Sequence, residues 1–242
     1  MLIKIENLVK IFSTEEVEST VLHGLSFSVS EGEFVAIMGQ SGCGKSTLLN
    51  IIGLIDDPSS GSYKFNSQEV AGRNEEDLSV LRKENISFIF QSFNLIDELT
   101  VAENIELALL YRDEISDAER KKRVADVMER MDITPRAKHY PTQLSGGQQQ
   151  RVAVARALVS SPKLILADEP TCNLDSERGL EVLRMLREMK ETGVAVIMVT
   201  HSLEHAEYAD RVIHVSDGRI LSDREGVNKD LPIGKSAVKI AV

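Results

Sequence analysis

The sequence predicts an α/β protein with a mostly parallel central sheet, and three observations support that fold class. Short, apolar and partly β-branched segments are typical of buried strands, and they occupy residues 34–38, 86–90, 164–167 and 195–200. Helical spacing of apolar residues appears between them, at 45–55 and 178–191. The composition, with 42% hydrophobic and 27% charged residues in 242, is that of a globular chain. Alternating strands and helices imply crossover connections.

Two regions depart from this alternation. Residues 1–30 contain period-2 patterns, and residues 63–65 follow a turn at 58–61, which predicts an antiparallel β layer. Residues 97–160 carry almost no strand signal and show helical stretches at 101–111, 117–131 and 148–160. We therefore expect one domain over 1–242. Its expected parts are a core with the β layer at 1–96 and 161–225, an inserted helical subdomain at 97–160, and a C-terminal tail at 226–242.

Charge and cysteine content exclude several classes. Lys and Arg number 28 against 38 Asp and Glu, a formal net charge of −10, which argues against a dedicated nucleic-acid binder. Cys43 and Cys172 are too few for a disulfide scaffold. No run approaches the apolar length of a membrane span, and the first residues lack the apolar stretch of a signal peptide. These features favour an acidic cytoplasmic protein without a nucleic-acid partner.

Residues 39–47 match the phosphate-binding motif G-x-x-x-x-G-K-[ST] between a predicted strand and a predicted helix. Glycines let backbone N–H groups converge on an anion, and the helix N-terminus adds a favourable dipole. Lys45 supplies a positive charge to the β- and γ-phosphates, and Ser46 is placed to ligate Mg²⁺. The expected contacts are Gly39, Ser41, Gly42, Cys43, Gly44, Lys45, Ser46 and Thr47. This motif alone leaves kinases, GTPases, helicases and transport ATPases open.

Two acidic residues follow the predicted strand at 164–167. Asp168 is placed to hold a water on Mg²⁺, and Glu169 is placed to orient or deprotonate an attacking water. Two carboxylates beyond a buried strand are costly unless a metal or a hydrogen-bond donor satisfies them. The pattern therefore favours a hydrolytic site over an ordinary acidic helix cap.

A second phosphate-binding helix start is predicted at residues 144–151, LSGGQQQR. Ser145 fits the N-cap position, and Gly146 and Gly147 permit close approach of a phosphate to the backbone. One chain thus carries two such helix starts. Head-to-tail dimerisation uses both, because the second site of each chain then closes over the first motif of its partner.

These motifs together resemble those of the ATP-binding cassette (ABC) ATPases, in the right order and over roughly residues 2–221. Residues 39–47 resemble the Walker A motif of that family, 164–169 its Walker B motif, and 144–148, ending at Gln148, its signature motif. The resemblance implies a P-loop NTPase of the ABC-ATPase fold, with a RecA-like core, an antiparallel β subdomain and an inserted helical subdomain. It also implies a homodimer that binds ATP and Mg²⁺ and hydrolyses ATP to ADP and phosphate.

The resemblance also assigns roles to single residues. Gln91 matches the glutamine that reaches Mg²⁺ and the attacking water, and His201 matches the histidine that contacts the γ-phosphate. Asp175 belongs to the D-loop, and Phe12 occupies the place of the aromatic residue that stacks on adenine. A core role for Phe12 stays open. The implied catalytic residues are Glu169, His201 and Gln91, and the implied metal ligands are Ser46, Gln91 and Asp168.

Longer stretches, such as QLSGGQQQRVAVARALV, are similar to the MacB/LolD-type group of macrolide-export and lipoprotein-releasing ATPases. This resemblance implies an integral-membrane permease with few transmembrane helices as partner, moved by ATP-driven closure of the ATPase dimer. It places the chain in the cytoplasm, peripheral on the inner face of the cell membrane. Residues 93–99 include four large apolar residues where the family has its permease groove, and we expect one or two of them to be exposed.

Three other functions stay open at this point. A soluble ABC protein acting on ribosomes or DNA usually has two fused cassettes or long coiled coils, which this sequence lacks. A regulator that binds ATP without hydrolysing it is disfavoured by Glu169 and His201. The ATPase of a cargo-free envelope-remodelling or peptide-sensing complex would have the same sequence features.

The cysteines lead to a separate hypothesis. Cys43 precedes Lys45 at a helix N-terminus, which favours the thiolate, and we expect alkylation of Cys43 that ATP prevents. Cys172 stands where the resembling group normally has glycine.

Overall fold

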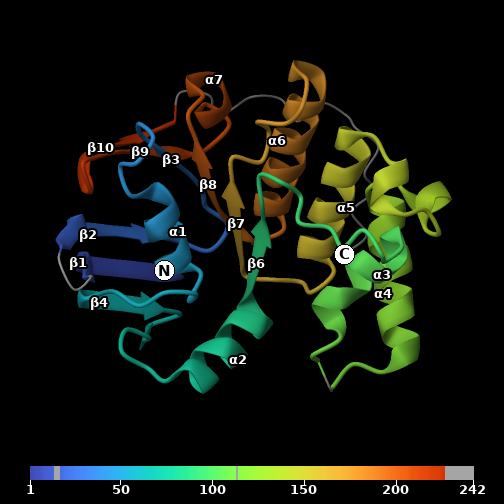
Figure 1. Ribbon diagram of the computed structural model, residues 1–242, viewed down its shortest axis with the longest axis horizontal. Coiled ribbons are helices and arrows are strands. Elements are labelled where there is room, and N and C mark those ends of the chain that lie inside the picture. The colour runs from blue at the N-terminus through green and yellow to red at the C-terminus, as the bar shows by residue number, and fades with distance from the viewer. Residues whose placement is uncertain (14–16, 113, 227–242) are drawn as a thin grey trace.

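The computed structural model describes residues 1–13, 17–112 and 114–226, and it contains two sheets that lie side by side (Figure 1). The larger sheet has the order β10-β9-β3-β8-β7-β6. Its strands are β3 (Phe34–Met38), β6 (Ile86–Ile89), β7 (Leu164–Asp168), β8 (Ala195–Thr200), β9 (Arg211–Ser216) and β10 (Arg219–Glu225). The smaller sheet has the order β2-β1-β4-β5. Its strands are β1 (Ile3–Ser13), β2 (Glu18–Val29), β4 (Ser60–Phe65) and β5 (Gln68–Glu69).

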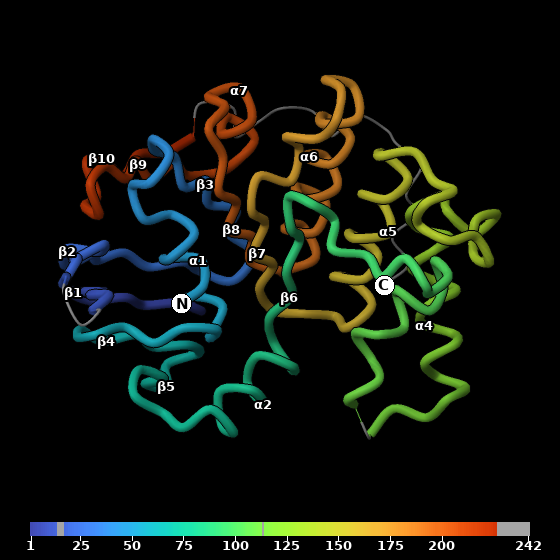
Figure 2. Tube along the Cα trace, in the orientation of Figure 1, coloured from blue at the N-terminus to red at the C-terminus, as the bar shows by residue number. Residues whose placement is uncertain are grey.

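Helices flank the larger sheet on both faces, and their path is easiest to follow in the tube view (Figure 2). The α-helices are α1 (Lys45–Ile52), α2 (Glu75–Asn85), α3 (Val101–Glu106), α4 (Asp117–Arg130), α5 (Gly146–Leu158), α6 (Ser176–Glu191) and α7 (Leu203–Ala206). Short 3₁₀ turns are η1 (Leu107–Leu109), η2 (Thr134–Arg136) and η3 (Pro141–Gln143). None of the helices in the described part of the chain is both long enough and apolar enough for a membrane span.

The parallel core predicted from the apolar segments is confirmed. β3, β6, β7, β8 and β9 run parallel, and β10 pairs antiparallel with β9. Side chains of β3 alternate between two clusters: Phe34 and Ala36 belong to one, and Val35 and Ile37 to the other. Helix α1 and the smaller sheet cover one face, and α5 and α6 cover the other. Burial of both faces explains why these strands are continuously apolar.

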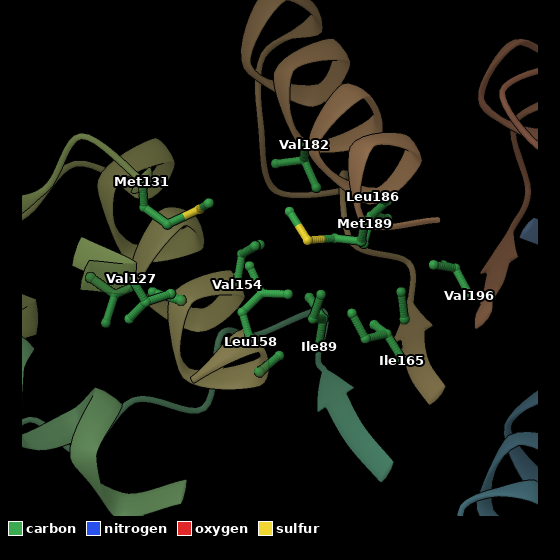
Figure 3. Packing of buried hydrophobic residues seen from close by; sticks show 14 of the residues in the cluster. Ile89, Val127, Met131, Val154, Leu158, Ile165, Val182, Leu186, Met189 and Val196 are labelled. Carbon is green, nitrogen blue, oxygen red and sulfur yellow. The ribbon is translucent and has the colours of Figure 1, made fainter. Parts of the chain in front are cut away.

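The cluster under α4, α5 and α6 joins the helices to the central sheet (Figure 3). Val154 and Leu158 of α5 and Leu186 of α6 face Ile165 of β7 within this cluster. The helical spacing of these residues gives each helix one apolar stripe for the sheet. Helices α3, α4 and α5 therefore form a group beside β6 at one end of the sheet (Figure 1).

The antiparallel layer and the predicted helices are present, but several helices begin or end at other residues than predicted. Helix α1 ends at Ile52, and Leu54 then takes a φ of 58°, a left-handed conformation that does not continue the helix. The stretch expected at 101–111 divides into α3 and η1, and α5 begins at Gly146. The tail expected at 226–242 falls beyond the described residues, apart from Gly226.

The elements that were not predicted include α2, α7, β5, β9 and β10. Helix α2 buries Leu78 but leaves Val80 45% exposed, so its apolar periodicity is weak. Asn74 caps it by accepting a hydrogen bond of 2.8 Å from the backbone N–H of Asp77. Strand β9 completes the parallel sheet beside β3, and its register pairs Ala36 with Val212.

A buried hydroxyl connects α1 to the smaller sheet. Tyr63 of β4 is 1% exposed and donates a hydrogen bond of 2.7 Å to the carbonyl of Ile52. The Tyr63→Phe variant is expected to lower the free energy of unfolding by about 1–2 kcal/mol, because the buried carbonyl loses this donor. Urea denaturation measures the change. Tyr111→Phe is the control: Tyr111 is 77% exposed, and we expect a change below about 0.5 kcal/mol. Equal stability of the Tyr63→Phe and wild-type proteins would contradict the role of this bond.

Candidate functional site

Loops that follow parallel strands meet at one edge of the larger sheet. The register pairs Met38, the last residue of β3, with Thr200, the last residue of β8, and β7 lies on the other side of β8. The loops after these three strands begin with Gly39, His201 and Glu169. Because carboxyl ends of parallel strands share an edge, the loops converge there.

The turn from β3 into α1 requires glycine at two points. A Cβ on Gly39 would lie 2.1 Å from the carbonyl oxygen of Val215, so no side chain fits. Gly44 has a φ of 97° directly before α1, a conformation that glycine adopts readily. Lys45 is only 5% exposed, and its Nζ donates to the carbonyls of Gly39 at 2.8 Å and Gln40 at 2.7 Å. The turn thus holds a buried ammonium group at the edge of the sheet.

Glu169 and His201 lie against each other. Glu169 Oε1 is buried and 3.2 Å from His201 Nε2, without the geometry of a hydrogen bond. His201 Nδ1 donates to the Gly39 carbonyl at 3.0 Å. The first contact is an ion pair when the imidazole is protonated. His201 therefore connects the loop after β7 to the loop after β3.

Partial burial shifts the pKa of both carboxylates, Asp168 and Glu169. It raises the pKa of Asp168, against the opposing charges of Lys45 and His201. It also raises the pKa of Glu169, where His201 opposes the shift and Asp168 adds to it. Desolvation therefore outweighs the nearby positive charges at both positions. A group that binds here with hydrogen-bond donors or positive charge will stabilise the ionised forms.

These loops surround a cleft of about 320 Å³. The structure brings together ten of the residues predicted for the site, namely Ser41, Gly42, Gly44, Lys45, Ser46, Thr47, Gln91, Asp168, Glu169 and His201. Val21 of β2 and Val199 of β8 also line the cleft. Sequence reasoning missed these two valines, since apolar strand residues carry no signal that separates a lining position from a core position.

The oxygen donors in the cleft fit a hard divalent cation. Ser46 offers a hydroxyl, Gln91 an amide oxygen and Asp168 a carboxylate, which are ligand types that Mg²⁺ prefers. Within the described ranges, no group of three or more His, Cys, Asp and Glu side chains is placed to hold a metal. The chemistry therefore fits Mg²⁺ that takes its remaining ligands from water and phosphate oxygens.

The second predicted phosphate-binding segment is a well-capped helix start outside this cleft. Ser145 Oγ accepts from the N–H of Gln148 at 3.4 Å, and Gln148 Oε1 accepts from the N–H of Ser145 at 3.0 Å. The N–H groups of Gly146 and Gly147 fall in the first turn of α5, where a helix supplies no acceptor. None of these four residues lines the cleft. The start of α5 thus has backbone N–H groups without helical acceptors, and it lies outside the cleft lining.

Contacts within the chain connect the cleft to the start of α5. The Gln91 carbonyl, in the loop that lines the cleft, accepts a hydrogen bond of 2.8 Å from Asn173 Nδ2. A Cβ on Gly147 would come within 2.6 Å of Arg178 Cδ, so the start of α5 packs closely on the start of α6. Asp175 caps α6 and lies 3.0 Å from Arg178 Nη1. The loop between β7 and α6 therefore touches both the Gln91 loop and the glycines of α5.

Besides residues 145–148 and Asp175, three predicted residues lie apart from the cleft lining. Gly39 contributes its carbonyl to Lys45 and His201, as described above, while the Cys43 side chain packs in the core cluster beneath α1. Phe12 is 46% exposed near the end of β1, and Lys10 Nζ lies 5.0 Å from the centre of its ring. The ring is therefore a surface group rather than a core residue, so the alternative core role is wrong. Adenine stacking on Phe12 stays a prediction.

Comparisons with known proteins agree with this fold and these motifs. A sequence profile of the ABC transporter family matches residues 22–172. The chain is 47% identical over 222 residues to the macrolide export ATP-binding/permease protein MacB of Brucella melitensis, a match that covers 92% of this chain and 34% of that protein. It is 44% identical over 228 residues to the uncharacterized ABC transporter ATP-binding protein MJ1508 of Methanocaldococcus jannaschii, covering 94% and 100%. The chain spans about a third of the length of the curated MacB relatives that it matches.

Solved structures give the same result. The dimeric post-hydrolysis state of the ATP-binding cassette MJ0796 bound to ADP and Pi has a TM-score of 0.85 and 40% identity, and the match covers 93% of this chain and 98% of that one. CbiO1 of Clostridium perfringens, part of the transporter complex CbiONQ, has a TM-score of 0.83 and 29% identity, with 93% and 88% covered. These similarities confirm the P-loop ABC-ATPase fold class.

The two cysteines differ in exposure. Cys43 is 6% exposed and its Sγ lies 3.7 Å from Lys45 Nζ, so its burial argues against the expected sensitivity of Cys43 to alkylation. Cys172 is exposed and free. Desolvation by its neighbours raises the pKa of the Cys172 thiol, and a hydrogen bond with Gln91 acts in the opposite direction.

Alkylation is therefore expected first at Cys172. The thiolate reacts, and a raised pKa keeps this thiol protonated near pH 7. The rate with iodoacetamide should rise by about tenfold for each pH unit below the thiol pKa. Peptide mass spectrometry after timed labelling measures both sites, and a Cys172→Ser variant gives the rate at Cys43 alone. Faster modification of Cys43 than of Cys172 would contradict the exposure seen in the structure.

Proposed function

The chain belongs to the ABC transporter family, and on that premise we propose that it drives a MacB/LolD-type permease through ATP-dependent closure of a homodimer. As an ABC ATPase it hydrolyses ATP. The observation that carries the proposal is the cleft itself, where Lys45 of α1 meets Asp168 and Glu169 at the end of β7 and His201 after β8. The finer parts of the proposal are the roles of these residues, the partner and the mechanical coupling.

The phosphates of ATP bind at the turn before α1 in this proposal. Ser41, Gly42 and residues 44–47 line the cleft at the start of a helix, where anions are favoured. Lys45 Nζ, which now bonds two carbonyls of its own turn, turns to the β- and γ-phosphates. Mg²⁺ held by Ser46, Asp168 and Gln91 neutralises phosphate charge when bound.

Glu169 is the group that activates water in this proposal. Its pKa is raised by burial, which makes the carboxylate a better proton acceptor than an exposed glutamate. The contact with His201 holds the carboxylate toward the cleft. His201 also bonds the Gly39 carbonyl, so it lies between the water-activating group and the phosphate-binding turn. These two contacts support a role for His201 in contacting the γ-phosphate.

The unused helix start at Gly146 and Gly147 supports dimer formation. A second chain arranged head to tail would bring its Ser145, Gly146, Gly147 and Gln148 to the γ-phosphate in the cleft of the first. The neighbour MJ0796 is a dimer in its ADP- and Pi-bound structure, which is consistent with this arrangement. The γ-phosphate then links the two chains, and its removal releases that link.

A separate groove supports a membrane-protein partner. It has a volume of about 420 Å³ and lies between α2, β6, η1 and α5. Its described lining includes three cations, Arg82, Lys83 and Arg156, and no acidic residue, in a chain with a net charge of −10. Arg82 pairs with Glu75 at 2.9 Å, but Lys83 and Arg156 bond neutral carbonyls. The groove thus offers uncompensated positive charge to a partner.

Apolar groups flank the same groove. The rings of Phe88 and Phe90 stack with centroids 5.4 Å apart in its lining, and Tyr111 at its edge is 77% exposed. Ile96, in the neighbouring loop, is 43% exposed, which confirms that one of the four apolar residues of 93–99 is exposed. The MacB relatives combine ATP-binding and permease functions in their names, which supports a permease as the occupant. We propose that a cytoplasmic segment of the permease docks here.

Removal of the proposed general base is the first test. Glu169→Gln should lower the ATPase kcat by at least about 100-fold, because the amide cannot accept the proton from water, while ATP binding is retained. Phosphate release measures turnover, and a fluorescent ATP analogue measures binding. Glu191→Gln is the matched control, since Glu191 lies at the end of α6 and outside the cleft lining. Near-normal turnover of Glu169→Gln would remove Glu169 from this role.

Charge reversal in the groove tests the partner. Tagged Glu169→Gln protein purified from host membranes with Mg-ATP should bring down an integral-membrane permease. Adding Lys83→Glu should lower the recovery of the permease roughly tenfold, because the groove loses a positive charge and gains a negative one. Lys121→Glu, at an exposed position of α4, should leave the recovery unchanged. Recovery of ribosomes or nucleic acid without a membrane protein would contradict the permease proposal.

A further inference from the structure

A side-chain hydrogen bond outside the cleft connects the two loops that carry Glu169 and His201. Thr171 Oγ1 and His205 Nδ1 are 2.9 Å apart. Thr171 lies two residues after Glu169 and is 5% exposed, and His205 lies in α7, four residues after His201. Neither Thr171 nor His205 lines the cleft.

This bond closes a ring of contacts. Glu169 meets His201 at 3.2 Å, and the chain continues from His201 into α7, where the N–H of His205 donates to the capping Ser202 Oγ at 3.2 Å. His205 then returns to Thr171, and the chain leads back to Glu169. Removing any one member opens the ring and leaves the two loops with fewer contacts between them.

Glu169 needs such support because its backbone is strained. Its φ is 44°, in the left-handed region that a non-glycine residue rarely adopts. The next residue is Pro170, and a residue before proline favours extended backbone instead. The Glu169 N–H donates to the Val199 carbonyl at 3.1 Å, and the Glu169 carbonyl accepts from the N–H of Cys172 at 3.2 Å. Both bonds are made by the backbone, and the Thr171–His205 bond adds a side-chain contact that ties this turn to α7.

We propose that His205 and Thr171 are positioning residues that keep Glu169 and His201 aligned for hydrolysis, an inference that rests on the proposed roles of those two residues. The bond acts through the backbone of the two loops and not through contact with the nucleotide. Burial lowers the pKa of His205, which favours the neutral imidazole, whose unprotonated nitrogen accepts from a hydroxyl. Its loss should therefore change kcat more than ATP binding.

Variants that remove one partner each provide the test. Thr171→Val and His205→Val should each lower kcat about tenfold, with KM for ATP within about twofold, because the water-activating group is displaced. The double variant should be no worse than either single variant, since all three lack the same bond. Thr171→Ser keeps the hydroxyl, and His205→Asn places an amide near the position of Nδ1, so both should retain most of the activity. His205→Gln has a longer side chain that carries its amide beyond the position of Nδ1, so this variant should lose activity as the valine variant does.

Controls separate positioning from folding and from the proposed function. His139→Val, at a half-buried histidine near η2, should leave kcat unchanged. Thermal denaturation and binding of a fluorescent ATP analogue establish that each variant folds. If the valine variants unfold, the difference in kcat between His205→Asn and His205→Gln tests the positioning role instead.

Wild-type turnover in Thr171→Val and His205→Val, or losses that add in the double variant, would overturn the positioning role. Equal turnover of His205→Asn and His205→Gln would overturn it too. Retained turnover in Glu169→Gln would instead show that the proposed function has failed.

Discussion

The register of β3, β8 and β7 is the constraint on which the rest of the structure depends. These strands are buried on both faces, so a slip of one residue would exchange the side chains of two separate core clusters. The same register fixes the height at which each strand ends. Gly39, His201 and Glu169 therefore meet because the core packs correctly, and core stability and site geometry rest on the same strand pairing.

The cleft also differs from the rest of this acidic chain in the environment of its charged side chains. Partial burial raises the pKa of both Asp168 and Glu169 despite Lys45 and His201, so the ionised forms of these groups are less favourable here than in water. The proposed Mg²⁺ would offset that cost. The loop at 90–94 reaches both the cleft, through Gln91, and the cationic groove, where Arg156 donates to the Phe93 carbonyl at 2.8 Å. A change in the cleft thus has a short physical route to the proposed permease groove.

Sequence reasoning predicted what local patterns determine. The apolar runs predicted the parallel strands, and the motif residues predicted eight of the residues that line the cleft. The resemblance to the ABC ATPases added Gln91 and His201. It missed α2 because that helix buries little apolar surface, and it missed Val21 because a lining valine resembles any strand valine. It predicted that Cys43 contacts the nucleotide because Cys43 lies in the motif beside Lys45, whereas the fold buries the Cys43 side chain in the core. The Thr171–His205 contact joins residues 34 positions apart, and no spacing rule reveals such a pair.

The central claim is that a complete site takes its phosphate contacts from two chains, because the helix start at Ser145 lies outside the cleft of its own chain. Sedimentation velocity of the Glu169→Gln protein, with saturating Mg-ATP and then with Mg-ADP, tests it most directly. The account predicts a particle of about twice the 26.8 kDa chain mass with Mg-ATP and a single chain with Mg-ADP. A single chain under both conditions, with ATP bound, would contradict it.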